Sequence, residues 1–215
     1  DTERRISCTM SIAPARLFVI AAPSGAGKTT LVKALTTRNP DLRFSISYTT
    51  RPKRRNEAHG VDYLFVDKDE FDQLRTKGAL LESAEVFDNF YGTSREQVDR
   101  HLGVGHHVIL EIDWQGAQQV RNAMPECVTV FILPPSREEL ERRLRSRGTD
   151  TEEVIERRLR DALSDMSHWD EFDYVIFNDD LDQAVADLEA VLAGNGEASA
   201  TDNPGVRATA EALLR

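Results

Sequence analysis

The stretch "LFVIAAPSGAGKTTLVKALTTR", residues 17–38, constrains the fold of this chain more than any other stretch. An apolar run leads into a glycine-containing loop, which is followed by a lysine, a threonine and a helical pattern. In such a loop the backbone N–H groups surround a phosphate, and the positive end of the following helix points at it. The sequence therefore predicts a strand over 17–22, a helix over 28–38 and, between them, a site for a nucleoside triphosphate.

The loop differs from the general pattern G-x-x-x-x-G-K-[ST] in its first residue, which is Ala22. An alanine is acceptable at the end of the strand if its φ angle stays negative, whereas Gly25 and Gly27 supply the freedom that the curled backbone needs. Lys28 would reach the β- and γ-phosphates, and Thr29 would offer its hydroxyl to Mg²⁺. The alternative is a glycine-rich turn without a ligand. We expect the phosphates to contact Ala22, Pro23, Ser24, Gly25, Ala26, Gly27, Lys28, Thr29 and Thr30.

Short apolar runs alternate with helical patterns along most of the chain, which is typical of a parallel sheet with helices on both faces. The runs are nearly continuous in apolar residues, as expected of strands that are buried on both sides. The expected strands are 17–22, 107–112, 128–133 and 174–177. The expected helices are 28–38, 114–123, 136–146, 151–167 and 181–193.

Two segments break this alternation. Residues 45–93 contain short strand candidates, a basic turn and one helix, which predict a small inserted sheet, and residues 137–158 are charge-rich and helical. The core then consists of residues 17–44, 94–136 and 159–193. Residues 1–16 carry no clear period and read as a flexible extension. Residues 194–215 read as a flexible tail, with a linker over 194–205 and a short helix after it.

Composition excludes several classes of protein. A formal net charge of -10 disfavours a general binder of nucleic acids or membrane surfaces, because such proteins need a broad positive field. The two cysteines, Cys8 and Cys127, predict neither a disulfide framework nor a zinc site. No apolar stretch approaches a membrane span, and the N-terminal residues lack the apolar core of a signal peptide. We therefore expect a cytoplasmic protein, and the sequence leaves its oligomeric state open, a homo-oligomer included.

The basic turn "RPKRR", residues 51–55, has several readings. On composition alone it is a solvated turn or a nucleic-acid patch. Its place in the first insertion after the phosphate loop favours another reading, since nucleoside monophosphate kinases hold their acceptor there. The planar guanidinium of arginine grips phosphate oxygens through two hydrogen bonds, and the phenols of Tyr63 and Tyr91 are suited to donate to the same phosphate.

Six motifs make the comparison specific: "YTTRPKRRNEAHGVDYLFV", "NFYGTS", "ILEIDWQGAQQVR", "FILPPS", "RLRSRGTDTEEVIERRL" and "YVIFNDDL". In this order and spacing the chain resembles guanylate kinases of the bacterial type, over about residues 17–193. Alanine is common at the first loop position of that family. The resemblance implies an α/β fold: a P-loop kinase core with a parallel sheet flanked by helices, a small inserted mixed α/β GMP-binding subdomain and a helical lid. It also implies direct in-line transfer of the γ-phosphate of ATP to GMP, with dGMP as a second acceptor and Mg²⁺ bridging the ATP phosphates.

The resemblance also assigns the acceptor site. The GMP phosphate would contact Arg51, Arg54, Tyr63 and Tyr91, with Glu57 in the same pocket. The guanine ring would contact Ser47, Glu82, Thr93 and Asp113. Guanine presents two neighbouring N–H donors, at N1 and N2, so that a carboxylate such as that of Glu82 can accept from both. Adenine has an acceptor at N1 and would leave that carboxylate unpaired. Taken alone, Glu82 would read as an exposed carboxylate on a strand.

Seven arginines lie between residues 142 and 160, interleaved with glutamates. Most of them fit helices with ion pairs between residues i and i+4. The resemblance implies that Arg143, Arg147 and Arg158 close on the ATP phosphates and act with Lys28 in catalysis, and it places Asn178 near the adenine of ATP. Glu111 stands where many relatives have aspartate, and we expect it to keep an acidic role near Mg²⁺ or Lys28.

Two other functions stay open on the sequence. One is a non-catalytic guanylate-kinase-like interaction domain, which is disfavoured because Lys28, Thr29 and the lid arginines are present. The other is a related kinase with a different acceptor, such as a ribosyl phosphate, which is disfavoured by the residues expected to face guanine.

Overall fold

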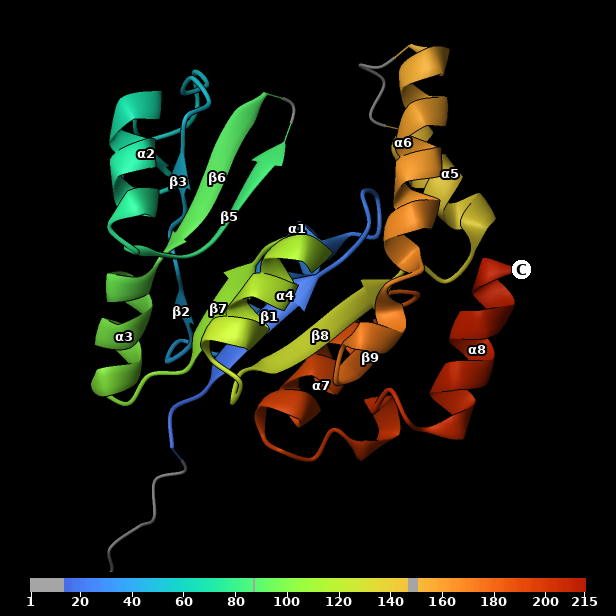
Figure 1. The fold of residues 1–215 in the computed structure, drawn as a ribbon. Helices are drawn as coiled ribbons and strands as arrows, with labels where there is room; N and C mark the ends of the chain where they lie inside the picture. Colours follow the sequence, from blue (N-terminus) through green and yellow to red (C-terminus); the bar gives the residue numbers. More distant parts are fainter. Residues whose placement is uncertain (1–13, 87, 147–150) are drawn as a thin grey trace, which may run out of the picture.

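The computed structural model describes residues 14–86, 88–146 and 151–215 (Figure 1). Its centre is a five-stranded parallel sheet with the order β2-β7-β1-β8-β9. The strands are β1 (Leu17–Ala21), β2 (Arg43–Phe44), β7 (Val108–Glu111), β8 (Val128–Leu133) and β9 (Tyr174–Phe177). The four predicted core strands are confirmed, and the short edge strand β2 is an addition, since two residues carry no periodic signal.

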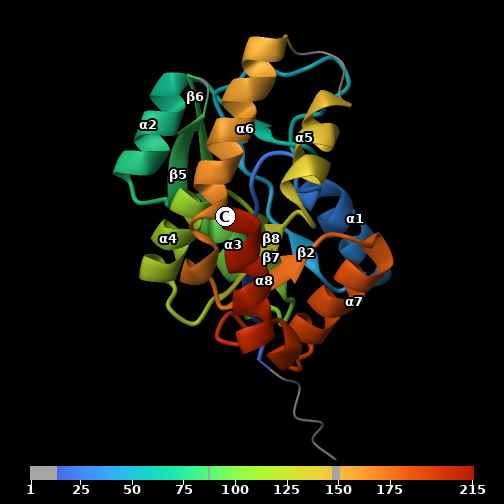
Figure 2. The same ribbon diagram turned by 90° about the vertical axis from the view of Figure 1, so that its right-hand side faces the viewer.

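Alternation of side chains along β1 builds two separate apolar layers. Leu17 and Val19 point to one face, where they pack with residues of α4 (Trp114–Ala123). Phe18 and Ile20 point to the other, where they pack with α1 (Lys28–Arg38) and α7 (Leu181–Leu192). Figure 2 shows α4 on one side of the sheet and α1 and α7 on the other. The parallel sheet is therefore buried on both faces, as its continuous apolar strands predict.

Short polar side chains begin several of the helices. Ser94, Asp113, Ser136 and Asp180 each accept a hydrogen bond from a backbone N–H group in the first turn of the helix that follows. The predicted helices are confirmed to within two residues at each end, and α3 (Arg95–Gly103) was not predicted. The remaining helices of the core and of the expected lid are α5 (Arg137–Arg145), α6 (Glu152–Met166) and the short η1 (Trp169–Glu171).

A second, four-stranded sheet is inserted between β2 and α3, with the order β4-β3-β6-β5. It consists of β3 (Tyr48–Thr49), β4 (Leu64–Phe65), β5 (Leu80–Val86) and β6 (Asn89–Ser94), with α2 (Lys68–Thr76) packed on it. The sheet is mixed, because β3 pairs parallel with β4 and antiparallel with β6. The predicted inserted sheet is thus confirmed, and Figure 1 shows it standing over the edge of the core at which β1 ends.

The C-terminal segment differs from the predicted flexible tail. Residues 194–205 turn back onto the core through η2 (Glu197–Ser199), and Ala200 forms a β-bridge with Tyr174 of β9. The expected short helix is present as α8 (Pro204–Leu214), whose Val206 and Ala210 are buried in the core. The segment packs because its few apolar side chains lie on one face of α8. The polar composition of residues 194–205 before this helix led to the prediction of a flexible tail.

Two further contacts tie the ends of the described chain to the core. Arg16, which we expected in the flexible extension, donates its backbone N–H to His107 Nδ1 at 3.0 Å and accepts from Val108 N at 3.0 Å. At the other end, Arg137 Nε donates to the carbonyl of Leu213 at 2.8 Å. Residues 1–13 lie outside the described part of the chain. Within that part, no helix combines the length and apolar character needed to cross a membrane.

Candidate active site

The loop between β1 and α1 has the backbone geometry that its glycines predict. Gly25 and Gly27 both have φ of 90°, a left-handed conformation that favours glycine. A Cβ atom added to Gly27 would lie 2.4 Å from Asn178 Nδ2, so a side chain does not fit there. Among the described residues other than glycine, only Asp88 has a positive φ, so Ala22 meets the condition set for it.

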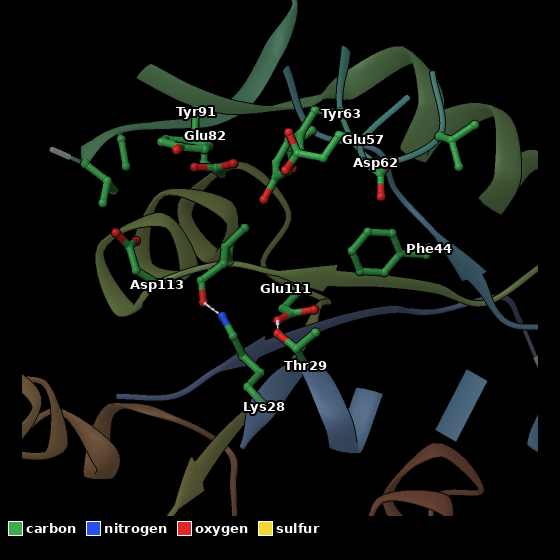
Figure 3. Close-up of a pocket in the computed structure, with 15 residues that line it drawn as sticks. Lys28, Thr29, Phe44, Glu57, Asp62, Tyr63, Glu82, Tyr91, Glu111 and Asp113 are labelled. Atoms are coloured by element: carbon green, nitrogen blue, oxygen red, sulfur yellow. Dashed lines mark hydrogen bonds between the residues drawn. The ribbon is translucent and has the colours of Figure 1, made fainter. Parts of the chain in front are cut away.

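The side chains of Lys28 and Thr29 leave the loop toward the end of β7. Lys28 Nζ donates to the carbonyl oxygen of Ile112 at 2.9 Å, and Thr29 Oγ1 donates to Glu111 Oε1 at 2.6 Å (Figure 3). Burial lowers the pKa of the Lys28 amine, and the nearby carboxylates of Glu111 and Asp113 oppose this shift. The amine is thus held in a fixed place beside negative charge.

The hydroxyl of Thr29 and the carboxylate of Glu111 form a pair of hard oxygen ligands. The described residues contain no cluster of three or more His, Cys, Asp or Glu side chains that could hold a metal ion. Mg²⁺ in kinase sites needs no such cluster, because it is bound by one or two protein oxygens together with substrate phosphates and water. The pair therefore fits Mg²⁺ that arrives with ATP.

The outer side of the loop rests on the start of the expected lid. Leu140 and Leu144 of α5 are buried, and their side chains pack against Gly25. Arg143 on the same helix donates to the carbonyl of Ala26 at 3.3 Å and to that of Asn178 at 3.0 Å. The lid predicted over 137–158 therefore begins with a helix that is packed into the core, because two of its leucines face the loop.

Asn178 also contacts the loop. Its side chain is buried, and Nδ2 donates to the carbonyl of Ala26 at 2.7 Å. The predicted place of Asn178 near the adenine of ATP stays a prediction. Arg158 is half-buried on α6, and Arg147 lies outside the described residues.

A cavity of about 540 Å³ opens between the inserted sheet and the core. Figure 3 shows Lys28, Thr29, Glu111 and Asp113 on the core side, facing side chains of the inserted sheet. Eight of the predicted site residues line the cavity: Lys28, Thr29, Ser47, Glu57, Tyr63, Glu82, Tyr91 and Asp113. The sequence thus predicts most of the polar lining, although these residues are spread over 86 positions from Lys28 to Asp113.

Glu82 and Asp113 lie close together in this cavity. Glu82 is buried and accepts a hydrogen bond from Thr93 Oγ1 at 2.6 Å, and burial raises the pKa of its carboxyl group to about 7. Asp113 Oδ1 accepts from the backbone N–H of Gly116 at 2.7 Å. A Cβ atom on Gly116 would lie 3.0 Å from Glu82 and 3.2 Å from Asp113, so this glycine makes room for both carboxylates.

A second polar group gathers around Glu57. Arg51 Nη2 donates to Glu57 Oε1 at 2.7 Å, and the guanidinium lies 5.4 Å from the centre of the Tyr63 ring. The rings of Tyr63 and Tyr91 are 6.0 Å apart. Glu57 also accepts from the backbone N–H of Arg54 at 2.8 Å, while the Arg54 side chain is exposed and does not line the cavity. The structure therefore brings one of the two predicted arginines together with both phenols.

Sequence reasoning missed the apolar residues at the mouth of the cavity. Phe44, Val61 and Val86 line it while remaining 41%, 70% and 37% exposed. Val61 and its neighbour Asp62 stand just before Tyr63, so position along the chain was an available signal for them. Phe44 belongs to the two-residue strand β2, for which no pattern existed.

The fold and the site together define a class of protein. A lysine-bearing phosphate loop at the end of a parallel strand faces, across one cavity, an inserted sheet that carries an arginine, two tyrosines and a buried carboxylate. This is the arrangement of a P-loop kinase that phosphorylates a small acceptor bound by its insertion.

Comparison with known proteins gives the family. The family model described as Guanylate kinase matches residues 14–195. Guanylate kinase of Alkalilimnicola ehrlichii is 53% identical over 201 residues, which cover 94% of this chain and 99% of that protein. Guanylate kinase of Escherichia coli (strain K12) is 51% identical over 84% of this chain and 88% of its own length. The crystal structure of guanylate kinase from Anaplasma phagocytophilum superimposes with a TM-score of 0.68 at 33% identity, covering 92% of this chain and 94% of that one. The chain belongs to the guanylate kinase family.

Proposed function

We propose that this chain binds ATP on the loop 22–30 and GMP in the facing cavity, and transfers the γ-phosphate directly from one to the other. It is an ATP:GMP phosphotransferase, as its family membership indicates, and its products are ADP and GDP. One observation carries the residue assignment: a single cavity is lined both by Lys28 and Thr29 of the phosphate loop and by the buried carboxylate of Glu82. A donor and an acceptor bound at its two sides would face each other.

On the donor side, the backbone N–H groups of the loop and the N-terminus of α1 would hold the ATP phosphates. Lys28 would bind the β- and γ-phosphates, and its hydrogen bond to the carbonyl of Ile112 would be replaced by one to a phosphate oxygen. Thr29 and Glu111 would hold Mg²⁺, which supplies positive charge to the phosphate oxygens when it is bound. Lys28 is the residue on which we expect turnover to depend most.

On the acceptor side, Glu82 would accept from N1–H and N2–H₂ of guanine, with Ser47, Thr93 and Asp113 around the ring. Thr93 supports this role through its hydrogen bond to Glu82, which leaves the other carboxylate oxygen for the base. Arg51, Tyr63 and Tyr91 would hold the GMP phosphate, with Arg54 joining them from the surface. Glu57 keeps the guanidinium of Arg51 in place by its ion pair.

The transfer step places few covalent demands on the protein. Phosphoryl transfer is accelerated by alignment of the two nucleotides and by neutralisation of charge on the moving group, so no strong general base is required. Arg143, Arg147 and Arg158 would supply positive charge and exclude water as the lid closes over ATP. Asn178 would support the same end of the loop. Both substrates are small nucleotides, so the proposal needs no nucleic-acid or membrane partner.

A coupled assay of ADP release tests the proposal directly. GMP, dGMP, AMP, UMP and a ribosyl phosphate are offered in turn with ATP and Mg²⁺. Release confined to the guanine acceptors supports the assignment of Glu82, and equal release with AMP or the ribosyl phosphate would overturn it. Binding of GMP without any ADP release would instead identify a non-catalytic module.

A further inference from the structure

The base of α6 is fastened to the first turn of α4 by a polar cluster that the proposed reaction does not use. Asp165 Oδ1 accepts from the indole Nε1 of Trp114 at 3.1 Å. The His168 ring stacks on the same indole, with ring centres 3.5 Å apart and planes inclined by 10°. His168 Nδ1 lies 2.6 Å from Glu171 Oε1, and Glu171 accepts from Gln118 at 2.5 Å. We call Trp114, Gln118, Asp165, His168 and Glu171 the α4–α6 clamp.

The clamp contacts the start of α4, next to the turn between β7 and α4, and this turn contributes residues to both proposed substrate sites. Trp114 is the first residue of α4 and follows Asp113, whose carboxylate caps the helix and faces Glu82. The residue before Asp113 is Ile112, whose carbonyl oxygen accepts from Lys28. This turn is fixed by β7 and by the cap, so that it is a firm support for α6.

On α6, the clamp lies on the same face as Arg158. Residues 158, 162 and 165 are separated by four and three positions, which aligns them along one side of a helix. Ala162 is fully buried and Asp165 contacts α4, so this face is turned toward the core at the base of the helix. Arg157 and Arg160 lie on other faces, with side chains 70% and 69% exposed. Arg158 stands two turns, about 10 Å, above the clamp.

Apolar contacts already restrict the rotation of α6, because Ile155 and Met166 are buried along with Ala162. A hydrogen bond from an indole to a carboxylate has one geometry, since both groups are directional. Burial raises the pKa of the Asp165 carboxyl group, and the hydrogen bond from Trp114 opposes this shift. The hydrogen bond from Trp114 to Asp165 therefore adds a directional constraint on the rotation of α6 to its apolar contacts.

We propose that Trp114 and Asp165 are positioning residues for the transfer step. The hydrogen bond between them fixes the rotation of α6 about its axis, and this rotation brings Arg158 to the transferring phosphoryl group. The inference rests on the proposed function, in which Arg158 neutralises charge on that group. Trp114 and Asp165 themselves touch neither nucleotide.

The test uses variants that change one feature of the contact at a time. Trp114→Phe keeps a ring for His168 to stack on and removes the donor, and Asp165→Leu removes the acceptor. Each should lower kcat about tenfold, because the lost hydrogen bond orients Arg158 for the transfer step. KM for ATP and GMP should change less than about twofold, because neither residue contacts a nucleotide. Asp165→Asn keeps an acceptor oxygen and should restore kcat to within about threefold of the parent.

Epistasis separates positioning from general destabilisation. The double variant Trp114→Phe/Asp165→Leu should lose no more than either single variant, and Trp114→Phe should have no further effect in an Arg158→Ala background. Trp169→Phe is the matched control: it alters a buried tryptophan at the same end of α6 that packs against Arg207 of α8, and it should lower Tm without changing kcat.

Three results would overturn the inference: unchanged kcat in Trp114→Phe, multiplicative losses in the double variant, or an undiminished effect of Trp114→Phe in the Arg158→Ala background. The proposed function fails in a different way, by absence of GMP-dependent ADP release from the unsubstituted protein. An active parent with an equally active Trp114→Phe variant therefore refutes only the positioning role.

Discussion

The donor loop and the acceptor cavity hold their polar side chains by different partners. In the loop region, most side-chain hydrogen bonds go to main-chain carbonyls, such as Lys28 to Ile112 at 2.9 Å and Asn178 to Ala26 at 2.7 Å, and the pair Thr29–Glu111 is the exception. In the cavity, side chains bond to one another: Arg51 to Glu57 at 2.7 Å and Thr93 to Glu82 at 2.6 Å. The loop is held mainly through main-chain carbonyls, whereas the cavity relies on pairs of side chains in which one partner is a carboxylate.

This difference separates the roles of the two regions. The neutral carbonyl of Ala26 does not compete for a phosphate, so its bonds from Asn178 and Arg143 hold the loop in the conformation that receives phosphates. Lys28 alone would exchange its bond to Ile112 for a phosphate oxygen. Charged side chains can leave one another for a ligand, and an acceptor site must do so for each new GMP. We therefore expect substitutions on the donor side to change kcat and ATP binding, and those on the acceptor side to change GMP selection and its pH dependence.

Lys28→Ala should have the largest effect. Its amine is the only group of the loop that brings a full positive charge to the phosphates, and loss of such a charge lowers kcat about 10³-fold. KM for GMP should stay within about threefold of the parent, because no acceptor residue is altered. Steady-state ADP release measures both constants. Lys33→Ala, on the exposed side of the same helix, is the control and should be fully active.

A Lys28→Ala protein that retains near-normal turnover would refute the assignment of the loop. A large rise in KM for GMP at unchanged kcat would refute the separation of the two regions, because it would place Lys28 in acceptor binding.

Glu82→Gln should have the next largest effect, and this effect should be on binding of GMP in the acceptor cavity. The amide presents N–H donors to the donors of guanine, so kcat/KM for GMP should fall about 100-fold while KM for ATP is unchanged. Glu85→Gln, on the exposed end of the same strand, is the matched control. Equal losses for the two variants, or a parallel loss of ATP affinity, would show that Glu82 does not select the base.

The pKa of Glu82 predicts a pH dependence of intermediate size. Guanine binding needs the ionised carboxylate, and burial raises its pKa to about 7. GMP affinity should therefore fall about tenfold per pH unit as the pH drops below about 7. The phosphate of GMP also titrates in this range, with a pKa of about 6. Titration calorimetry on Glu82→Gln isolates the carboxylate, because that variant keeps only the phosphate dependence.

The raised pKa of Glu82 also affects the stability of the protein without ligand, but stability should change with pH in the opposite direction to GMP affinity. The pKa of Glu82 is higher in the folded protein than its ordinary value of 4.5, so the folded state holds the proton more tightly. The free energy of unfolding contributed by this group should therefore fall as the pH rises from 4.5 to about 7. Urea titrations across this range should show the slope in the parent and not in Glu82→Gln. A parent with no difference from the variant would contradict the raised pKa.

Sequence patterns predicted the core better than its attachments, for a physical reason. The strands of the core sheet are continuous apolar runs, and the helices α4, α5 and α7 begin at a capping side chain, so the limits of these elements follow from local sequence. β2 and β4 have two residues each, too few for a periodic pattern, and they are strands because they pair with β7 and β3. The docking of α8 depends on the surface that the core offers to Val206 and Ala210, which no local pattern describes.

The candidate site divides in the same way. The phosphate loop is predicted by its own residues, because its function requires consecutive backbone groups. The acceptor residues come from separate strands, and only the resemblance to a known family connected Arg51, Glu82 and Asp113. The hydrogen bonds of Asn178 and Arg143 to the loop were outside the reach of either argument, since they join segments more than 110 residues apart.

Asn178→Ala should have the smallest effect, and it tests how firmly the donor loop is fixed. The variant removes the hydrogen bond from Asn178 to the carbonyl of Ala26. Arg143 still donates to that carbonyl at 3.3 Å, so one of its two side-chain hydrogen bonds remains. Loss of one hydrogen bond predicts a rise in KM for ATP of about fivefold, with KM for GMP unchanged. Asn39→Ala is the control, because Asn39 also donates to a main-chain carbonyl, that of Leu35, at the far end of α1. If Asn178→Ala raised both KM values equally, the loop and the cavity would share one support, and the contrast between a backbone-anchored donor site and an exchangeable acceptor site would not hold.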